Sequence, residues 1–558
     1  MHCAGVQGGC AVSVVPDRAC GTRAVPLGDA SFATDWARAN PAALRFLPRH
    51  ASSEHAWEVR VEEAARISPS REVWEAAGAV GERLGAGQAS RRGVDLLARG
   101  DALCVVAGQQ PGVFGGPLYT LYKAMTAVAL ARDLTGKLNR AVVPVFWNAS
   151  DDSDFGEVAT TRLPDRALRS MRCTLRGADL PAGAMVGSMD TAATLLALGE
   201  VNGFQDFGPG GEFFSRTVRD ALSVAADHGQ MAAALLHRLL EGSGLVVVDG
   251  RSAELRHAAR DLFERYAEHM AEVGDAVAVR GRDLEAAGYT APVDDRAGRS
   301  ALFLLADGRR LRFEGTPGEL AGVIARDPAA VSPNVVLRPM VQDTVLPNVA
   351  TVAGPGEIAY HAQIAPAYDL LGVTMAIPFP RLSATLVPRG VFELAERRGA
   401  SAWDFVQDFD GALRRTVDRA LPGGLADGLR RLEKSLESTT REVGHEASAF
   451  DARLSGAVDE ADRRMREAAS RLREKVAVAA RRVEIGRDPG IRAYREFLRP
   501  RGLGQERVLG CATLPLLAGR TFAHCLAAPL DAHLRAVRAA EPAHWLVDME
   551  EWTPEAGA

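Results

Sequence analysis

The chain has 558 residues, of which 47% are hydrophobic and 25% are charged, and its formal net charge is −5. This length exceeds what one hydrophobic core supports, so we expect roughly three to four structural units. The acidic balance argues against a nucleic-acid partner and no apolar run is long enough to cross a bilayer, so we predict a cytoplasmic location without a membrane partner.

The first hundred residues carry few motifs. Residues 1–30 have no basic segment before their apolar residues, so we predict no signal peptide. They also show no clear period, so we expect either a ragged leader without regular structure or an edge strand. Residues 31–100 show helical spacing of apolar side chains. The seven cysteines of the chain form no CxxC pair, which argues against zinc, and no neighbouring histidine supports a catalytic cysteine.

A glycine-rich loop, from Gly108 to Gly116, lies between an apparent buried strand (Leu103 to Ala107) and a helix with Pro117 in its first turn. Such a turn leaves backbone N–H groups free at the positive end of the helix dipole, which favours phosphate or carboxylate. The loop matches neither the P-loop nor the dinucleotide fingerprint, and a tight turn without function is the alternative.

The next apolar run, from Ala141 to Ser150, is continuous, as expected for a parallel strand covered on both faces. Asp151-Asp152-Ser153-Asp154 and Glu157 follow it. Carboxylates at the carboxyl end of such a strand can hold a magnesium ion, receive an amine or cap a helix. Capping accounts for only one of them, so we favour a function for Asp152 and Asp154.

The middle of the chain alternates between core and insertions. Residues 159–240 are mixed, Gly244 to Asp249 is a second buried strand, and a helix is predicted from Ser252 to Val273. Asp307-Gly308 marks a hairpin turn within short alternating runs over 280–333. Asn334 to Leu337 is predicted to be a strand.

A second glycine-rich turn, Gly354-Pro355-Gly356-Glu357, lies between an apolar strand and an apparent helix. It could present N–H groups to an anion, whereas Glu357 could simply complement the helix dipole. Arg338 is a candidate ligand for a carboxylate or phosphate, or a partner of Asp343.

The character of the sequence changes after about residue 390. A shorter helix over 401–420 precedes apolar residues that recur every three or four positions from Leu425 to Val483, which predicts one long coiled-coil helix. Such a seam packs against its own hairpin partner or a second subunit, so we expect a dimer. A last helical stretch is predicted from Val508 to Leu534.

Five blocks together resemble the bacillithiol biosynthesis cysteine-adding enzyme family. In chain order they are GQQPGVFGGPLYTLYK, PVFWNASDDSDF, LRPMVQDTVLPNVATVAGPGEIAYHAQ, PRLSATL and LRPRGLGQER. The resemblance implies an α/β fold with a Rossmann-type parallel-sheet core related to class I synthetases and nucleotidylyltransferases, two connective insertions and a C-terminal helical coiled coil that forms a homodimer. The corresponding parts of the core are 1–158, 241–280 and 334–388, the insertions are 159–240 and 281–333, the coiled-coil domain is 389–498, and 499–558 is a helical segment returning to the core.

The implied reaction adds L-cysteine to glucosaminyl malate through an amide bond. A carboxylate does not acylate an amine at neutral pH without activation, so ATP with Mg²⁺ is expected. We assign catalytic roles to Asp152, Asp154, Lys123 and Glu357. The substrate- or nucleotide-binding candidates are Gly108, Gln109, Gln110, Gly112, Gly115, Gly116, Tyr119, Trp147, Arg338, Gly354, Gly356, Tyr360, Arg381, Gln505 and Arg507. Pro380-Arg381 and Gln505-Glu506-Arg507 are expected to meet near the base of the coiled coil as a second nucleotide-sized pocket.

The chain departs from the family pattern at three positions. Ser153 stands where a histidine is usual, Ala365 where a lysine is expected, and Pro388 where a glutamate often follows. The alternatives are a ligase for another amino acid or acceptor, a nucleotidyltransferase on the same core, and a catalytically inactive dimeric scaffold.

Overall fold

The computed structural model describes residues 15–17, 22–28, 30–175, 181–200, 204, 207–416, 421–487, 490–550 and 552. Its centre is a sheet of five strands: β3 (Ala102–Gln109), β4 (Ala141–Asn148), β7 (Val246–Asp249), β11 (Asn348–Ala353) and β12 (Ile377–Pro380). They pair in parallel in the order β12-β11-β3-β4-β7. Numbered along the chain, this order is 5-4-1-2-3, the Rossmann arrangement. The predicted Rossmann-type core is therefore confirmed.

The core strands are apolar along their whole length because both faces of the sheet are covered. Leu103 to Ala107 of β3 are fully buried. The long helix α6 (Leu118–Leu138) comes after β3 and the first glycine-rich turn. The long helix α17 (Pro355–Leu370) comes after β11 and begins within the second glycine-rich turn. The predicted helical region 31–100 is also confirmed. It contains α1 (Phe32–Ala37), α2 (Pro41–Leu44), α3 (Glu54–Ala65), α4 (Arg71–Arg83) and α5 (Gln88–Ala98).

Two segments between core strands, called here the first and second insertions, carry further elements. The first contains α7 (Phe155–Val158), β5 (Thr160–Pro164), β6 (Ser170–Thr174), the single 3₁₀ turn η2 (Val186–Ser188), α8 (Ala192–Glu200), α9 (Pro209–Leu222) and α10 (His228–Leu239). The second contains α14 (Asp295–Arg299), β8 (Leu302–Ala306), β9 (Arg309–Arg312), α15 (Pro317–Arg326), η4 (Pro328–Ala330) and β10 (Val331–Pro333). The predicted hairpin turn is present, since Asp307 and Gly308 both have positive φ, 50° and 72°.

Two local predictions were wrong. Residues 334–337 form a turn into α16 (Arg338–Val345), not a strand, because the Asn334 side chain accepts a hydrogen bond from Val336 N at 2.8 Å and starts a turn. The predicted helix from Ser252 to Val273 is broken at Ala259 and His269, whose backbones leave the helical region. It comprises α11 (Ala253–Ala258), α12 (Arg260–Glu268) and the start of α13 (Met270–Ala286).

A second, four-stranded sheet joins the two ends of the described chain. It consists of β1 (Val15–Asp17), β2 (Thr22–Pro26), β14 (Ala543–Asp548) and β13 (Ala384–Val387), in that order. β14 pairs antiparallel with β2 and parallel with β13. The C-terminal segment is therefore not purely helical as predicted. For the part of residues 1–30 that is described, the edge-strand interpretation holds.

The C-terminal half is otherwise helical. Its helices are α18 (Arg389–Arg398), α19 (Ala402–Gln407), α20 (Phe409–Arg415), α22 (Gly423–Phe450), α23 (Ser455–Arg487), α24 (Gly490–Leu498), α25 (Gln505–Val508), α26 (Thr513–Ala518), α27 (Phe522–Cys525) and α28 (Ala527–Arg538). No helix among the described residues is long and apolar enough to cross a membrane.

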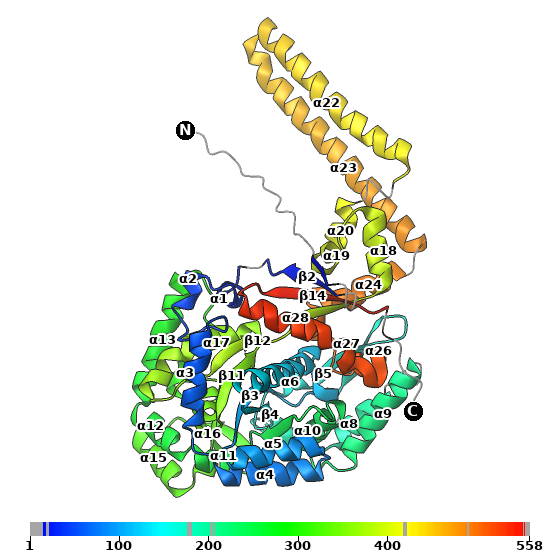
Figure 1. Cartoon of the computed structure of the whole chain (residues 1–558). Coiled ribbons are helices and arrows are strands. Elements are labelled where there is room, and N and C mark those ends of the chain that lie inside the picture. Colours follow the sequence, from blue (N-terminus) through cyan, green and yellow to red (C-terminus); the bar gives the residue numbers. More distant parts are fainter. Residues whose placement is uncertain are drawn as a thin grey trace.

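The coiled coil is a hairpin of two helices that projects from the body of the molecule (Figure 1). The single long helix predicted over 425–483 is wrong: the chain reverses after Phe450, where Asp451 leaves the helical conformation and caps a 3₁₀ turn, η5 (Ala452–Leu454). The two helices pack on each other, and Arg473 of α23 bonds Glu433 of α22 at 2.8 Å. The coiled coil thus packs first against its own hairpin partner.

Candidate active site

A cavity of about 490 Å³ opens at the carboxyl ends of β3, β4 and β11. In a Rossmann-type sheet the connections diverge between the first and fourth strands, and ligands bind in the crevice formed there. Those strands are β3 and β11, so both glycine-rich turns converge on one cavity. Fourteen sequence-predicted residues line it: Gly108, Gln109, Gln110, Tyr119, Lys123, Trp147, Asp152, Arg338, Gly354, Gly356, Glu357, Tyr360, Arg381 and Arg507.

Lys123 and Glu357 form an ion pair across the switch point, with Nζ and Oε2 at 2.6 Å. The Lys123 ammonium also donates to Gly108 O and to Gln109 Oε1, both at 2.9 Å. Burial lowers the pKa of Lys123, and the nearby Glu357 carboxylate opposes that shift. Burial alone would raise the pKa of Glu357, but Lys123 and the Gly354 N–H together hold it below its usual value. The Glu357 side chain is therefore a carboxylate at neutral pH.

Glu357 has a structural role as well. Its Oε2 accepts a hydrogen bond from Gly354 N at 2.7 Å, which closes a capping interaction at the start of α17. The dipole-complementing role considered from the sequence is thus real. Because one carboxylate joins the cap of α17 to the Lys123 ammonium on α6, it fixes the two walls of the cavity relative to each other.

Carboxylates gather on the β4 side. Asp152 accepts hydrogen bonds from Ser153 N at 2.6 Å and from Gln110 Nε2 at 3.0 Å, and the same amide nitrogen reaches Glu157 at 2.9 Å. Asp151 is buried and accepts a hydrogen bond from Ser332 Oγ at 2.7 Å. Gln110 thus ties the glycine loop to the acidic turn, and the Asp152 carboxylate keeps part of its surface open to the cavity.

Arginines supply most of the opposite charge. Arg338 Nη2 donates to the Tyr360 hydroxyl at 3.0 Å and Nη1 donates to Gln342. The alternative pairing of Arg338 with Asp343 is wrong, since the Asp343 carboxylate accepts hydrogen bonds from Asn348, Tyr368 and the Ala376 N–H. Burial raises the pKa of Tyr360 to about 12, so its hydroxyl stays protonated at neutral pH.

Arg381 lies at the boundary between this cavity and a second one of about 430 Å³. Its guanidinium bonds Glu506 at 2.6 Å and lies 5.3 Å from the centre of the Tyr119 ring. The predicted meeting of Pro380-Arg381 with Gln505 and Glu506 therefore occurs, and both segments line the second cavity. Arg507 faces the first cavity instead.

Five sequence-predicted residues do not line the main cavity. Asp154 is exposed and caps α7, accepting a hydrogen bond from Glu157 N at 3.2 Å. The Gln505 amide is occupied by Leu386 N, Leu386 O and Phe497 O, which is a structural role at the edge of β13.

The other three, Gly112, Gly115 and Gly116, shape the loop through their backbone. Gly115 and Gly116 have φ of 90° and 79°, and a Cβ on Gly112 would stand 2.6 Å from Gly116 Cα.

Arg310 and Asn334 line the cavity although no sequence pattern predicted them as site residues. Arg310 comes from β9 of the second insertion, stacks on Phe303 at 4.2 Å from the ring centre and approaches Asp152 at 3.7 Å. Asn334, also from this region, lines the same cavity. One arginine in an exposed-looking hairpin carries no local signal, because its approach to the acidic turn depends on how the insertion folds back over the sheet.

Comparison with known proteins gives the family. The model described as "Bacillithiol biosynthesis BshC, N-terminal Rossmann-like domain" matches residues 23–382, and the model of the "C-terminal coiled-coil domain" matches residues 384–535.

Relatives with the name "Putative cysteine ligase BshC" match most of the chain. The protein of Koribacter versatilis is 34% identical over 418 residues, covering 72% of this chain and 76% of that protein. Those of Solibacter usitatus and Salinibacter ruber are 31% and 30% identical, over 76% and 77% of this chain and 81% of each relative. Together with the Rossmann strand order and the projecting helical hairpin, these matches establish that the chain belongs to the BshC family of bacillithiol biosynthesis.

Proposed function

We propose that this protein is a cysteine ligase, which joins the carboxyl group of L-cysteine to the amine of glucosaminyl malate. Relatives that match most of the chain carry the name "Putative cysteine ligase BshC". The observation that carries the proposal is the cavity at the switch point, which has Lys123, Arg338 and Arg381 on its walls and the Asp152 carboxylate facing them. A site with both signs of charge suits an amino acid, a dicarboxylic acceptor and the amine that attacks.

We propose ATP as the activating co-substrate. The cations that line the cavity suit phosphate or carboxylate oxygens. Among the described residues, no group of three or more histidines, cysteines or carboxylates is arranged to hold a metal ion. Mg²⁺ would thus arrive with the nucleotide and take few protein ligands, as it commonly does in phosphate sites.

The roles of the side chains follow from their charge and position. Arg338 and Arg381 hold an anionic group, either a carboxylate or a phosphate. Lys123, whose three N–H donors bond Gly108, Gln109 and Glu357, fixes the wall beside them. Asp152 accepts a hydrogen bond from the acceptor amine and orients it, and the amine attacks in its uncharged form. Arg338 and Tyr360 offer hydrogen-bond donors on the wall of α16 and α17. Preorganised donors and charges of this kind stabilise the transition state without moving during the reaction.

We also propose a homodimer formed through the helical hairpin. Apolar side chains on α22 and α23 remain exposed in the single chain, including Leu432 at 39% and Leu472 at 45%. Such a surface on a projecting element suits a second copy of the hairpin.

A ligation assay followed by mass spectrometry tests the function. Purified protein is incubated with L-cysteine and glucosaminyl malate, with and without Mg-ATP. A product at the mass of bacillithiol that depends on ATP is the expected result. A product formed without ATP would contradict the proposal that ATP activates the carboxyl group. Release of pyrophosphate in the absence of the acceptor amine would indicate a nucleotidyltransferase. No product from folded protein, also with other amino acids and acceptors, would contradict the ligase proposal.

A further inference from the structure

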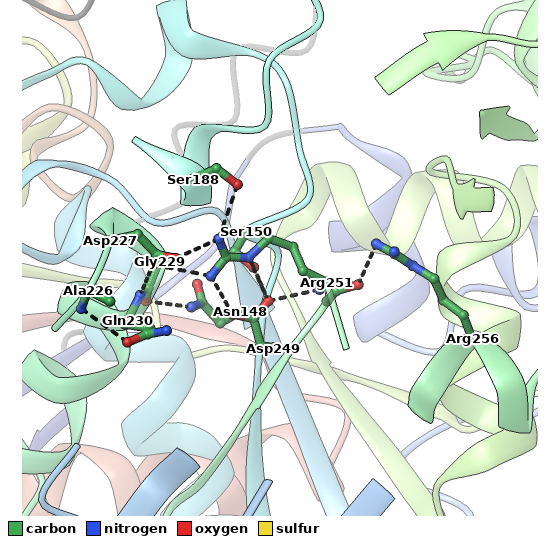
Figure 2. A network of polar contacts seen from close by, with 11 residues as sticks. Asn148, Ser150, Ser188, Ala226, Asp227, Gly229, Gln230, Asp249, Arg251 and Arg256 are labelled. Carbon is green, nitrogen blue, oxygen red and sulfur yellow. Dashed lines mark hydrogen bonds and ion pairs between the residues drawn. The ribbon is translucent and has the colours of Figure 1, made fainter. Parts of the chain in front are cut away.

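Outside the cavity, an extensive polar network surrounds Arg251, just after β7 (Figure 2). Its guanidinium donates to both oxygens of Asp227, at 2.9 and 3.2 Å, and to both oxygens of Asp249, at 3.2 and 2.8 Å. It also donates to Ser150 Oγ at 3.1 Å and to Ser188 Oγ at 3.2 Å. One side chain thus bonds its near neighbour Asp249 and three residues that lie far from it in the sequence.

These four residues belong to different parts of the fold. Ser150 begins the acidic turn after β4, Ser188 ends η2, Asp227 caps α10 and Asp249 ends β7. The Ser150 hydroxyl also donates to the Asp249 carboxylate. Figure 2 shows Arg251 between Asp227 and Asp249, with Ser188 and Ser150 beside the same guanidinium. Arg251 therefore joins the first insertion to the ends of two core strands.

The first insertion holds the backbone of the acidic turn. Val186 N donates to Asp152 O at 2.7 Å, and Gly187 N donates to Ser150 O at 2.9 Å. The contact leaves no room for a side chain, since a Cβ on Gly187 would stand 2.4 Å from Ser150 Cβ. A Cβ on Gly229, in the first turn of α10, would meet Arg251 Nη2 at 2.8 Å. The backbone of the turn that carries Asp152 thus bonds η2, and Arg251 bonds the Ser188 hydroxyl at the end of η2.

We propose that Arg251 is a positioning residue for the reaction, because it fixes η2 and, through η2, the orientation of Asp152 in the cavity. This inference rests on the proposed function. Arg251 does not line the cavity. A guanidinium can satisfy two carboxylates and two hydroxyls at once through its planar fork, whereas an ammonium cannot, so lysine is not an equivalent residue at this position.

The test compares Arg251→Lys with a matched control, Arg49→Lys. Arg49 forms an ion pair with Glu63 at 2.7 Å, with exposed fractions of 16% and 24%, close to the 17% and 21% of Arg251 and Asp227. Asp227→Asn is the second test variant, because it keeps the volume and the cap of α10 and weakens only the fork contact. All are measured with and without Asp152→Asn.

We expect Arg251→Lys to lower kcat/KM about 100-fold, as a displacement of about 1 Å can. Asp152→Asn should then add little further loss, because both changes remove the same contribution. Asp227→Asn should act in the same direction, and Arg49→Lys should leave kcat/KM unchanged. Losses that multiply in the double variant, or an equal loss in Arg49→Lys, would overturn the inference in favour of a general effect on stability.

Hydrogen exchange gives a readout that does not depend on ligation. The Val186 and Gly187 amides should exchange faster in Arg251→Lys than in the wild type, and at the wild-type rate in Arg49→Lys. Unchanged exchange in Arg251→Lys would overturn the positioning role even if the wild type ligates. Faster exchange in a protein whose wild type forms no product would instead uphold the link from Arg251 to the acidic turn and contradict only the proposed function.

Discussion

Two neighbouring aspartates occupy very different environments. Asp152 faces the cavity beside Gln110 and Arg310, whereas Asp154 is exposed and caps α7. We expect Asp152→Asn to lower turnover roughly 100-fold with the fold intact, because the charge that orients the amine is lost. Asp154→Asn should remain close to wild type, since asparagine is an equally good cap. Steady-state kinetics on both variants check this prediction. An equal loss of turnover in both variants would mean that Asp154 also contributes to the reaction.

The Lys123–Glu357 pair predicts a pH effect on stability. Since the pKa of Glu357 is lower in the folded protein than in the unfolded chain, its carboxylate stabilises the fold above about pH 4.3, the ordinary glutamate pKa. This contribution is lost as the pH falls through the lower folded pKa. Glu357→Gln leaves the buried Lys123 without its carboxylate and should cost about 1–3 kcal/mol at pH 7.

Urea unfolding of wild type and Glu357→Gln from pH 7 down to pH 3 measures that difference. We expect the two free energies of unfolding to converge toward the acid end, because protonation removes in the wild type what the substitution removes in the variant. A difference that stays constant with pH would mean that Glu357 stabilises the protein through its cap alone.

At the scale of elements, the glycine loop is held from behind by a distant segment of the chain. Leu118 N donates to Leu509 O at 2.7 Å, and Cys511 N donates to Gly116 O at 2.9 Å. The Cys511 thiol donates to Gly115 O at 3.1 Å, and burial raises its pKa to about 12, so it is a protonated packing group. The loop is therefore preorganised by segment 509–511.

Gly115→Ala tests this arrangement. With φ of 90° and Cys511 Cβ 3.2 Å from the added Cβ, alanine should cost about 1–2 kcal/mol and lower activity by displacing the loop. Gly136→Ala in α6 is the control, because its Cβ would meet nothing within 4 Å, and it should stabilise by about 0.5–1 kcal/mol. Thermal unfolding and ligation are measured on both. Full activity in Gly115→Ala would mean that the loop tolerates displacement.

At the scale of the whole molecule, the hairpin predicts the oligomeric state. We expect a dimer by light scattering, and a monomer for Leu432→Glu combined with Leu472→Glu, because two charges would be buried on the proposed seam. Lys434→Glu, about 200° further around α22, should stay dimeric. If both variants keep the wild-type mass, the hairpin does not mediate association.

The sequence predicts what local patterns determine. Lys123 and Glu357 each follow a glycine-rich turn, and both could be found from that signal. Their contact could not, because it depends on β3 and β11 being neighbours. Asp152 and Asp154 look alike in sequence, and only the direction of α7 decides which one caps it. The apolar run after Asn334 predicted a strand, but a hydrogen bond from Val336 N to the Asn334 side chain starts a turn there. The position of Arg310 near Asp152 could not be predicted, because it depends on how the second insertion folds over the sheet.

The order of the second sheet also bears on how the protein is made. β14 lies between β2 and β13, yet it is synthesised after the whole helical hairpin. On the ribosome, the strand edges of β2 and β13 that pair with β14 therefore stay unpaired until residue 548 has emerged. The unpaired backbone N–H and C=O groups of such edges can pair with other chains. The nascent protein has its longest exposure to aggregation just before its sheet closes, and chaperone dependence should be greatest at that stage of synthesis.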